Sequence, residues 1–564
     1  MSLPERVPRR PGYDVTLHYI YRRAVELFPE REIVYRTSKG IERYTYAKAA
    51  ERMAMLASAL EKEAGVGKLD RVATLDWNTH WHYEAYFAVP MMGAVIHPVN
   101  VRLAPAEIAY VMSHAEDKVV IVHKDFIPLL EAVAPKVKSL EKVIVVDTDE
   151  VPSKIAGLPA YHYEDFIKEH GDPKYEWPEV SEDQPAGMGY TSGTTGLPKG
   201  TYHSHKAIVL HAMATALHLA ASGTVPFNSK ATILHIVPMF HVYSWGIPYS
   251  ATLIGAKQVY PNRLLTKVLL ELIEKEKVTF TAAVPTVLYM LLTDPESEKY
   301  DLSGLTWING GAPTPKALAL LAKKRGINLM VGYGLTETAP VLTLATPWPW
   351  QEEKLSEEEL MEIKLRTGYP IPLVDLRVVG PDGKPVPKDG KTMGEIAVRA
   401  PWVTPEYYKN PEKTEAAWRD GWFHTGDIAV WFPDGSVLIQ DRDKDVIKSG
   451  GEWISSVRLE DAISQHPGVA MVAVIAAKHP KWGERPVALI VPKPGWESKI
   501  TTEEIRNFLM ERFVKPGQIP KWWLPDKVVL VEDLPKTSVG KINKRALREK
   551  YSDILLKELG EGAS

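Results

Sequence analysis

Short runs of β-branched and other apolar residues alternate with helix-patterned segments over most of the first 440 residues of this chain. Each run is the length of a buried strand, and a helical pattern lies between most of them. This alternation predicts a parallel β-sheet covered by helices, the α/β class. No repeat or low-complexity linker interrupts it, so we expect one large N-terminal domain of α/β subdomains over residues 1–440. The clearest runs are RVATLD at 71–76, AVIHPV at 94–99, KVVIV at 118–122 and KVIVV at 142–146.

The C-terminal part of the chain has a different pattern. After the charged segment DRDKD at 441–445 come strand-like runs and helical segments, enough for a small α+β domain of roughly 120 residues, 446–564. We expect DRDKD to mark the domain boundary, whereas composition alone would make it a solvated turn between two strands. The segments include GVAMVAVIAA, RPVALIVP, KVVLVED, TEEIRNFLMERF and NKRALREKYSDILLKEL.

Charge balance and cysteine content exclude several classes of function. The chain has 68 Lys and Arg against 71 Asp and Glu, a net charge of -3, and this balance does not predict a nucleic acid partner. It has no cysteine, which excludes disulfides, zinc–thiolate sites, iron–sulfur ligation and thiol nucleophiles. The lack of cysteine suits a reducing compartment, and we expect a cytoplasmic protein.

One stretch, residues 207–256, is apolar enough to be compared with a membrane span. It contains a single formal charge, Lys230, but glycines, prolines and four histidines interrupt it. Because neither half forms a clean helix of bilayer length, we expect a buried core lining an apolar cavity and no integral membrane segment.

The segment YTSGTTGLPKG at 190–200 is the most informative motif. It places three glycines, four Ser or Thr hydroxyls and one lysine within eleven residues. Backbone amides, hydroxyls and an ammonium can then converge on phosphate oxygens. The spacing is not that of a Walker A loop. On composition alone, the alternative is a Gly/Thr-rich surface loop.

The same string resembles the phosphate-loop signature of the adenylate-forming enzymes, the superfamily of acyl-CoA synthetases, amino-acid adenylation domains and firefly luciferase. The resemblance spans nearly the whole chain and is strongest to bacterial long-chain fatty acyl-CoA synthetases. It implies two half-reactions in one site. A carboxylate first attacks the α-phosphate of Mg-ATP to give acyl-AMP, and the CoA thiol then displaces AMP. Six further motifs follow in the family's order: PMFHVYSW at 238–245, NGGAP at 309–313, GYGLTET at 332–338, WFHTGD at 422–427, DRDKDVIKSGGEWIS at 441–455 and PKTSVGK at 535–541.

The resemblance implies a role for individual residues around the nucleotide. Thr191 and Glu337 would assist Mg²⁺, which prefers hard oxygen ligands. Asp427 would accept hydrogen bonds from both ribose hydroxyls, assisted by Arg442. Taken singly, such residues have structural alternatives as caps, turns or packing. The remaining nucleotide set consists of Ser192, Gly193, Thr194, Thr195, Gly196, Lys199 and Thr336 at the phosphates, and Gly311, Gly332 and Tyr333 at adenine.

Lys541 matches the family's catalytic lysine, although it lies about 340 residues beyond the phosphate loop. It can act only if the small domain closes over the site, so the resemblance makes DRDKD, with Arg442 and Lys444, a hinge. The small domain would present Lys541 for adenylation and then the KSGGEW face, from Lys448 to Trp453, for thioester formation. Close long-chain relatives have DRLKDL, where this chain has Asp443 in place of leucine.

The acyl side of the site is expected in the segment around PMFHVYSW. Residues 237–256 contain no Asp or Glu to pair with a substrate α-ammonium, which disfavours amino acids. His241 occupies the family's position beside the substrate carboxylate, and Val242 follows it. Trp245 matches a proposed gate of the fatty-acyl tunnel, its alternative being a wall of the core. Gly334 stands where acetate-specific relatives carry Trp, which leaves room for a longer acyl chain.

We therefore expect an AMP-forming ligase that joins a medium- or long-chain fatty acid to coenzyme A, with Mg²⁺ as cofactor. Lys541, Glu337, Thr336 and His241 are the expected catalytic residues. One alternative is a CoA ligase for a short-chain, hydroxy or aromatic acid. Another is a non-catalytic nucleotide- or lipid-binding relative, although such a protein would not need Lys541, Asp427 and Glu337 together. Similar long-chain enzymes are homodimers, so a homodimer is expected by resemblance alone.

Two histidine pairs remain. They are His80 with His82 and His203 with His205, and each is spaced by two residues. That spacing suits a metal pair on a strand. No HExxH motif or carboxylate-rich partner accompanies them, so zinc is disfavoured.

Overall fold

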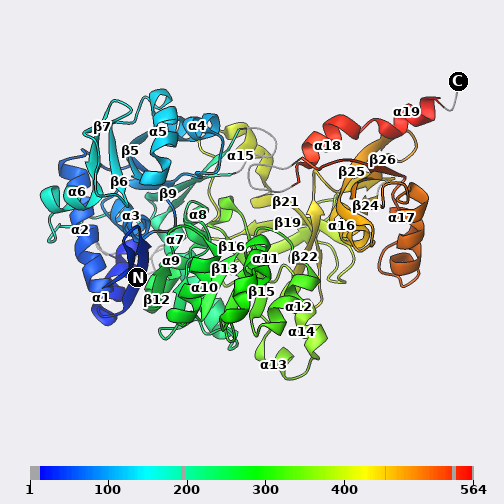
Figure 1. Cartoon of the computed structure of the whole chain (residues 1–564), viewed down its shortest axis with the longest axis horizontal. Coiled ribbons are helices and arrows are strands. Elements are labelled where there is room, and N and C mark those ends of the chain that lie inside the picture. Colours follow the sequence, from blue (N-terminus) through cyan, green and yellow to red (C-terminus); the bar gives the residue numbers. More distant parts are fainter. Residues whose placement is uncertain (1–12, 192–196, 451, 536–541, 562–564) are drawn as a thin grey trace, which may run out of the picture. The chain divides into compact units, whose positions relative to one another are not determined.

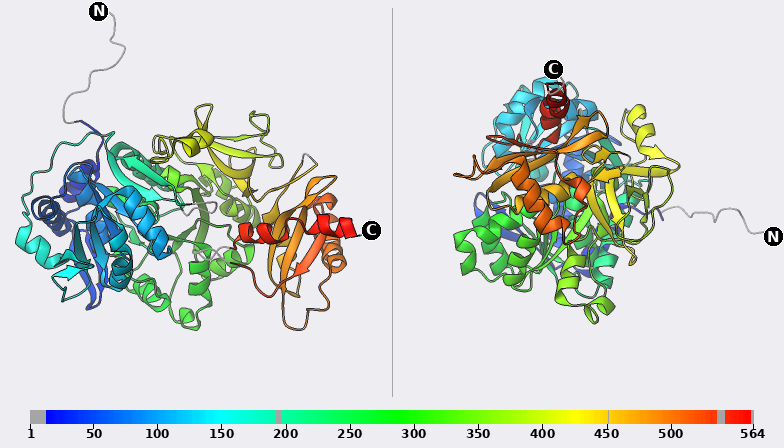
Figure 2. Two further views of the ribbon diagram at one scale, coloured as in Figure 1. Left: turned by 90° about the horizontal axis from the view of Figure 1, so that it is seen from above. Right: turned by 90° about the vertical axis from the view of Figure 1, so that its right-hand side faces the viewer.

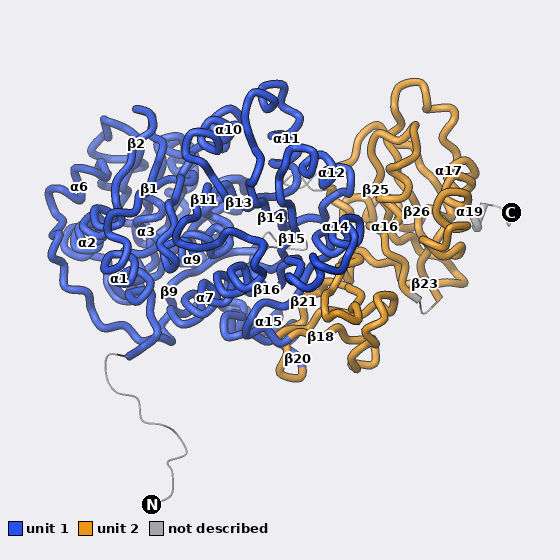
Figure 3. The backbone as a smooth tube through the Cα atoms, turned by 90° about the horizontal axis from the view of Figure 1, so that it is seen from below, with its two compact units in different colours: residues 1–193, 197–375, 399–419 blue, residues 194–196, 376–398, 420–564 orange. Residues whose placement is uncertain are grey.

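The computed structural model describes residues 13–191, 197–450, 452–535 and 542–561 (Figure 1). These residues form two compact units (Figure 3). Unit 1 contains the described residues up to Asp375 together with 399–419, and unit 2 contains 376–398 and those from Asp420 onward. The expected fold class, a large α/β part with a smaller C-terminal part, is confirmed. The boundary expected at 441–445 stays a prediction.

The first sheet of unit 1 contains the strands that the β-branched runs predict. Its order is β10-β9-β4-β3-β5-β6-β8-β7, with parallel pairing from β9 to β8. Its inner strands are nearly continuous apolar runs, as expected of a parallel sheet covered on both faces. The strands are β3 (Arg71–Leu75), β4 (Val95–Pro98), β5 (Asp117–His123), β6 (Lys142–Val146), β7 (Lys154–Ile155), β8 (Leu158–His162), β9 (Pro185–Tyr190) and β10 (Gly200–Ser204).

Helices connect these strands in the alternation that the sequence predicts. They are α2 (Tyr46–Lys62), α3 (His80–Met91), α4 (Pro105–Ala115), α5 (Ile127–Val133) and α6 (Tyr163–His170). Thr79 begins α3 as its N-cap, because its side chain accepts a hydrogen bond from the His82 backbone N–H. This cap places the two residues that precede it, Trp77 and Asn78, at the carboxyl end of β3.

The second sheet of unit 1 has the order β17-β16-β15-β14-β13-β11-β12-β1-β2. The run from β1 to β15 is parallel, so its carboxyl ends meet at one edge. The strands are β1 (Glu32–Thr37), β2 (Gly40–Thr45), β11 (Thr232–Leu234), β12 (Lys257–Tyr260), β13 (Phe280–Ala283), β14 (Thr306–Asn309), β15 (Asn328–Gly334), β16 (Val341–Leu344) and β17 (Tyr369–Pro370). The remaining helices of unit 1 are α1 (Leu17–Leu27), α7 (His205–Ala221), α8 (Val242–Trp245), α9 (Ile247–Ile254), α10 (Thr266–Lys275), α11 (Pro285–Thr293), α12 (Lys316–Lys324), α13 (Pro349–Glu352), α14 (Glu357–Leu365) and α15 (Pro411–Ala417).

The apolar stretch 207–256 is part of the core of unit 1, as expected. Most of α7 and α9 is buried, including His211, His218 and Tyr249. Within the described ranges, the structure has no helix long and apolar enough to cross a membrane.

Unit 2 contains the strands and helices predicted for the C-terminal part. One sheet pairs β18 (Asp375–Val379), β19 (Met393–Arg399), β21 (Trp422–Trp431) and β22 (Val437–Arg442). A second has the order β24-β23-β26-β25, with β27 beside β26, and α18 and α19 lie against β25 (Figure 2). These elements are β23 (Ile447–Ser449), β24 (Glu452–Ile454), β25 (Val469–His479), β26 (Gly483–Pro492), β27 (Lys527–Leu530), α16 (Ser456–Ser464), α17 (Thr502–Leu509), α18 (Lys544–Tyr551) and α19 (Ile554–Glu561).

Candidate active site

The phosphate-loop motif joins two paired strands of unit 1. β9 ends at Tyr190 and β10 begins at Gly200, and the strands pair in antiparallel register. At the mouth of the loop, Thr191 N–H donates to the Lys199 carbonyl (3.0 Å) and Lys199 N–H donates to Thr191 Oγ1 (3.3 Å). The two described ends of the motif are therefore held together. Ser192, Gly193, Thr194, Thr195 and Gly196 lie outside the described residues.

Lys199 and Glu337 are brought to the same place by a tyrosine that sequence analysis missed. The Lys199 ammonium lies 3.7 Å from the ring centroid of Tyr407. The Tyr407 hydroxyl donates to Glu337 Oε1 (2.7 Å), and Glu337 is 8% exposed. Burial lowers the pKa of Lys199, and the Glu337 carboxylate opposes that shift. The result is a buried carboxylate and a half-buried ammonium beside the ends of the phosphate loop.

The GYGLTET residues lie at the carboxyl end of β15. Thr336 and Glu337 form one short 3₁₀ turn after that strand. A Cβ on Gly189 of β9 would lie 3.6 Å from Thr336 Cγ2, so Thr336 lies beside the strand that enters the phosphate loop. A Cβ on Gly332 would lie 3.0 Å from Leu344 Cδ2, so a larger residue there would require that side chain to shift. Tyr333 is partly exposed.

The structure shows a steric reason for glycine at position 334 that the sequence did not reveal. A Cβ at this position would lie 1.9 Å from the Pro340 carbonyl oxygen and 3.0 Å from Val341 Cα. Backbone rather than a side chain would be struck, so a larger residue requires the chain at 340–341 to move. Room for an acyl chain at Gly334 stays a prediction.

The segment Val242 to Gly246 has an unusual backbone. Its five residues all have positive φ, with values of 29°, 55°, 52°, 56° and 73°. Left-handed conformations cost about 1–2 kcal/mol for each residue other than glycine, so the surrounding structure must hold this turn. We call residues 235–246 the acyl segment, because it carries His241, Val242 and Trp245.

Trp245 contacts a second predicted motif. A Cβ on Gly310 would lie 2.6 Å from Trp245 Cη2, so the indole packs directly on the backbone of NGGAP. Gly311 follows with a φ of 75°, a conformation that suits glycine. The structure therefore brings the predicted acyl residue Trp245 next to the predicted adenine residue Gly311. The smallness of Gly310 is the sequence signal that could have indicated this contact.

The two histidine pairs have structural partners. His80 and His82 lie on α3, not on a strand, while His203 lies on β10 and His205 begins α7. His82 Nε2 lies 2.7 Å from Thr74 Oγ1, and His203 Nδ1 lies 3.2 Å from the Tyr243 hydroxyl. Burial lowers the pKa of His82 and of His203 to about 4, so both are neutral at pH 7.

In unit 2, the predicted ribose residues face each other across a strand pair. Asp427 of β21 is opposite Arg442 of β22, and Arg442 Nε lies 2.9 Å from Asp427 Oδ1. Asp427 is buried, whereas the Arg442 side chain is half exposed. The two residues expected to act together on the ribose are therefore adjacent.

Ion pairs contact residues 443–448 of unit 2. Asp443, the residue that replaces leucine, pairs with Lys448 (3.0 Å), and Asp445 bonds to Arg548. Lys448 is directly opposite Trp453 in the β23–β24 hairpin. Burial lowers the pKa of Lys444. Lys541 lies outside the described residues.

Comparison with known proteins decides the family. A model of the AMP-binding enzyme family matches residues 21–408, and a model of the AMP-binding enzyme C-terminal domain matches residues 458–541. The chain belongs to the AMP-binding enzyme family. The resemblance to adenylate-forming acyl-CoA synthetases is thereby confirmed. The roles of the individual nucleotide residues in this AMP-binding enzyme stay predictions.

Three proteins illustrate what this AMP-binding enzyme is similar to. The long-chain-fatty-acid–CoA ligase of Thermus thermophilus is 46% identical over 544 residues, covering 96% of each chain. The medium-chain-fatty-acid–CoA ligase of Ectopseudomonas oleovorans is 39% identical, covering 93% of this chain and 94% of that one. The solved fatty acyl CoA synthetase of Mycobacterium tuberculosis is 27% identical with a TM-score of 0.70, covering 96% and 99% of the two chains.

Proposed function

We propose that this AMP-binding enzyme joins a medium- or long-chain fatty acid to CoA through an acyl-adenylate. The observation that carries the proposal is the 46% identity, over 96% of both chains, to a ligase named for long-chain fatty acids. A second relative is named for medium-chain acids, so the proposal covers both lengths. Burying one methylene contributes only about 0.8 kcal/mol of binding free energy. A pocket therefore discriminates weakly between fatty acids that differ in length by one methylene.

The first half-reaction brings a carboxylate toward a polyanion, so positive charge and hydrogen-bond donors must face the phosphates. Lys199 and the amides of the phosphate loop would supply them. Glu337 and Thr191 offer the hard oxygen atoms that Mg²⁺ prefers, and the Tyr407 hydroxyl donates to one oxygen of Glu337, Oε1. Mg²⁺, when bound, would offset negative charge on the phosphate oxygens.

Residues of unit 2 would contribute to both half-reactions. We propose that Asp427 and Arg442 hold the ribose and that Lys541 stabilises charge at the α-phosphate during adenylation. The segment from Lys448 to Trp453, with Lys444 in the expected hinge, would then serve thioester formation. One protein could thus support both steps by presenting different residues of its C-terminal domain.

The acid would be held by the acyl segment. His241 would orient the carboxylate, and Trp245 would border the acyl chain where it packs on Gly310. No acidic residue lies between 237 and 256, so the segment offers no partner for a substrate ammonium. A cytoplasmic location and a homodimer stay predictions.

Exchange of labelled pyrophosphate into ATP tests the proposal, because it requires reversible adenylation of an acid. The purified enzyme is given Mg-ATP and, in turn, acetate, octanoate, palmitate, benzoate and a hydroxy acid. We expect exchange with octanoate and palmitate and little with acetate. Exchange only with aromatic or hydroxy acids would replace the substrate class, and no exchange with any acid would contradict adenylation.

A further inference from the structure

The geometry points to Asn78 as a positioning residue for the acyl segment; this inference rests on the proposed function. Asn78 is 1% exposed and has three side-chain hydrogen bonds, all to backbone of that segment. Its Nδ2 donates to the His235 carbonyl (2.7 Å) and the Val237 carbonyl (2.8 Å). Its Oδ1 accepts from the Met239 N–H (3.1 Å). Both amide protons are thereby used, which no other residue type of this size can reproduce.

The three backbone contacts follow a pattern. They fall on residues 235, 237 and 239, every second residue of the segment, and the next member of that series is His241. The His241 N–H in turn donates to the Pro238 carbonyl (2.9 Å). Asn78 therefore fixes the chain immediately before the residue proposed to orient the carboxylate.

The left-handed turn is tied to the same backbone group. Ser244 is fully buried, and its Oγ donates to the Val237 carbonyl (2.9 Å), which already accepts from Asn78. One carbonyl oxygen thus receives two side-chain donors, one from Asn78 and one from within the segment. Because Ser244 precedes Trp245, this shared carbonyl links the position of His241 to that of Trp245.

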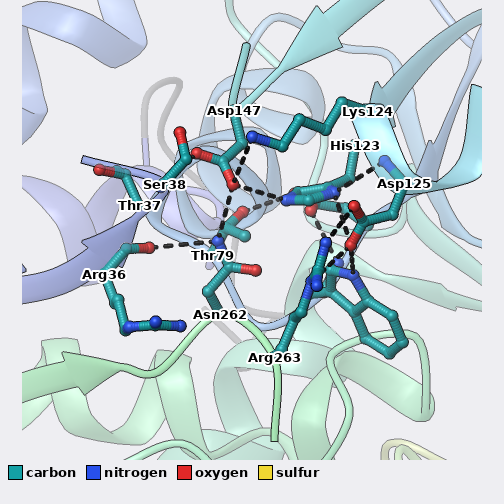
Figure 4. Close-up of polar contacts among 12 residues, drawn as sticks. Arg36, Thr37, Ser38, Thr79, His123, Lys124, Asp125, Asp147, Asn262 and Arg263 are labelled. Carbon is teal, nitrogen blue, oxygen red and sulfur yellow. Dashed lines mark hydrogen bonds and ion pairs between the residues drawn. The ribbon is translucent and has the colours of Figure 1, made fainter. Parts of the chain in front are cut away.

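Asn78 is itself held by a polar cluster in unit 1, in which His123, Asp147 and Asn262 are buried; Figure 4 shows the members of this cluster. The Asn78 carbonyl accepts from the Asn262 N–H (2.9 Å), and Asn262 Nδ2 donates to Asp147 Oδ2 (3.2 Å). Asp147 also accepts from the Ser38 N–H (2.8 Å) and lies 3.0 Å from His123 Nε2. We call Ser38, His123, Asp147 and Asn262 the strand-end cluster.

The cluster joins both sheets of unit 1. Ser38 follows β1 and Asn262 follows β12 of one sheet, while His123 ends β5 and Asp147 follows β6 of the other. Figure 4 shows the His123 and Asn262 side chains pointing toward the Asp147 carboxylate, which the Ser38 backbone also approaches. Asn78, which follows β3, therefore connects a rigid base shared by two sheets to the segment that carries His241.

A purely structural role makes a different prediction from a positioning role. A buried hydrogen bond that only stabilises the fold lowers the thermal midpoint without selecting one substrate. Thr281 provides the matched control, because its fully buried Oγ1 donates to the Leu234 carbonyl (2.7 Å), one residue before the acyl segment. Thr281→Val removes that bond at nearly constant volume.

The test compares Asn78→Ser, Ser244→Ala, the double variant and Thr281→Val by pyrophosphate exchange with palmitate. We expect the KM for palmitate to rise about tenfold in Asn78→Ser and about threefold in Ser244→Ala, since displaced substrate-positioning groups cost this order of effect. The KM for ATP should stay within about twofold. The double variant should show less than the product of the single effects, because both donors share one carbonyl.

Thr281→Val should lower the thermal midpoint and leave both KM values unchanged. The inference is overturned if the wild type exchanges but the palmitate KM of the variants is unchanged, or if their palmitate and ATP constants rise together. If Asn78→Ser does not fold, Ser244→Ala decides by the same criterion. A wild type that exchanges with no acid would instead refute the proposed function.

Discussion

The acyl segment of unit 1 and the segment 441–448 of unit 2 are held in different ways. Neutral, buried hydrogen bonds from Asn78 and Ser244 hold the acyl segment. In the other, the ion pair between Lys448 and Asp443 has both side chains about half exposed, at 50% and 51%. Leaving a buried polar group unpaired costs about 1–3 kcal/mol, whereas an exposed ion pair contributes about 0–1 kcal/mol.

This difference matches the roles proposed for the two segments. A segment that must hold a substrate benefits from contacts that water cannot replace. A segment that must rearrange between two half-reactions benefits from contacts that exchange with water at little cost. The comparison therefore predicts large, substrate-specific effects in unit 1 and small, salt-sensitive effects at the ion pairs of unit 2, apart from any residue that reaches the reacting phosphate.

Lys541 is the expected exception and should give the largest effect. Lys541→Ala should slow acyl-AMP formation about 100-fold or more, because one preorganised cation at the transition state is lost. Thioester formation from supplied acyl-AMP should largely survive. Rapid-quench assays of each half-reaction measure both rates. Lys515→Ala, which removes an exposed cation paired with Glu511 in the same unit, is the control. Equal losses in both half-reactions would contradict alternation of the domain.

Asp76 tests the buried side of the comparison through pH. It is fully buried, and burial raises its pKa to about 6 despite the opposing effect of His123. The folded protein then keeps a proton that the unfolded chain, with a pKa near 3.9, has lost. Its contribution to stability should be present below about pH 4 and be lost as pH rises through about 6.

The measurement is the free energy of unfolding at pH 4.5 and 7.5. Relative to Asp76→Asn, the wild type should lose about 1–3 kcal/mol over this interval. Asp147 provides a control of opposite sign, because hydrogen bonds from His123 and Ser38 outweigh burial and hold its pKa well below the usual value. Its contribution should instead be lost at low pH. If the free energy of unfolding changed with pH equally in the wild type and in Asp76→Asn, a raised pKa of Asp76 would be ruled out.

Tyr407 should give a smaller effect on catalysis. Tyr407→Phe removes the hydrogen bond to Glu337 and should lower the adenylation rate about tenfold, near the lower limit of the loss expected for one hydrogen bond to a charged group. The Mg²⁺ concentration needed for half-maximal rate should rise. Tyr202→Phe removes a similar hydrogen bond, to Glu406, and should change neither quantity. If Tyr407→Phe needed the same Mg²⁺ concentration as the wild type for half-maximal rate, Tyr407 would have no effect on Mg²⁺ binding through Glu337.

The smallest effect is expected at Asp443. Asp443→Leu breaks the half-exposed pair with Lys448 and should change the rate of thioester formation by about twofold or less. That rate should also become less sensitive to salt. Glu511→Gln breaks a comparably exposed pair in unit 2 and serves as the control. A tenfold change would show that the pair does more than an exposed ion pair can.

The order of strands and helices could be predicted because each has a local cause. The β-branched runs at 71–76 and 142–146 became β3 and β6, since buried parallel strands are apolar throughout. Motif order predicted Thr336 and Glu337 near the phosphate loop, and they lie beside its described ends; the roles of these residues and of Asp427 stay predictions. One expected helical run divided into α18 and α19, which end and begin on either side of Ser552.

The contacts that hold the site could not be predicted, because they join distant residues without a local signature. Nothing near Tyr407 indicates that it meets Lys199 and Glu337. The turn from Val242 to Trp245 contains no glycine, so its left-handed backbone contradicts the propensity of its residues. In the sequence, Asn78 is a single polar residue that follows a strand. Its proposed role depends on hydrogen bonds between its side-chain amide and the backbone of His235, Val237 and Met239, which only the structure shows.

The proposed function requires one enzyme to make an acyl-adenylate and then to transfer the acyl group to CoA. A single-turnover experiment with labelled palmitate, Mg-ATP and excess enzyme follows both steps. Without CoA, palmitoyl-AMP and pyrophosphate should accumulate and stop at one equivalent. Addition of CoA should then convert the adenylate to palmitoyl-CoA and release AMP. If palmitoyl-CoA forms without any adenylate that CoA can consume, or no AMP appears with any fatty acid, the account is wrong.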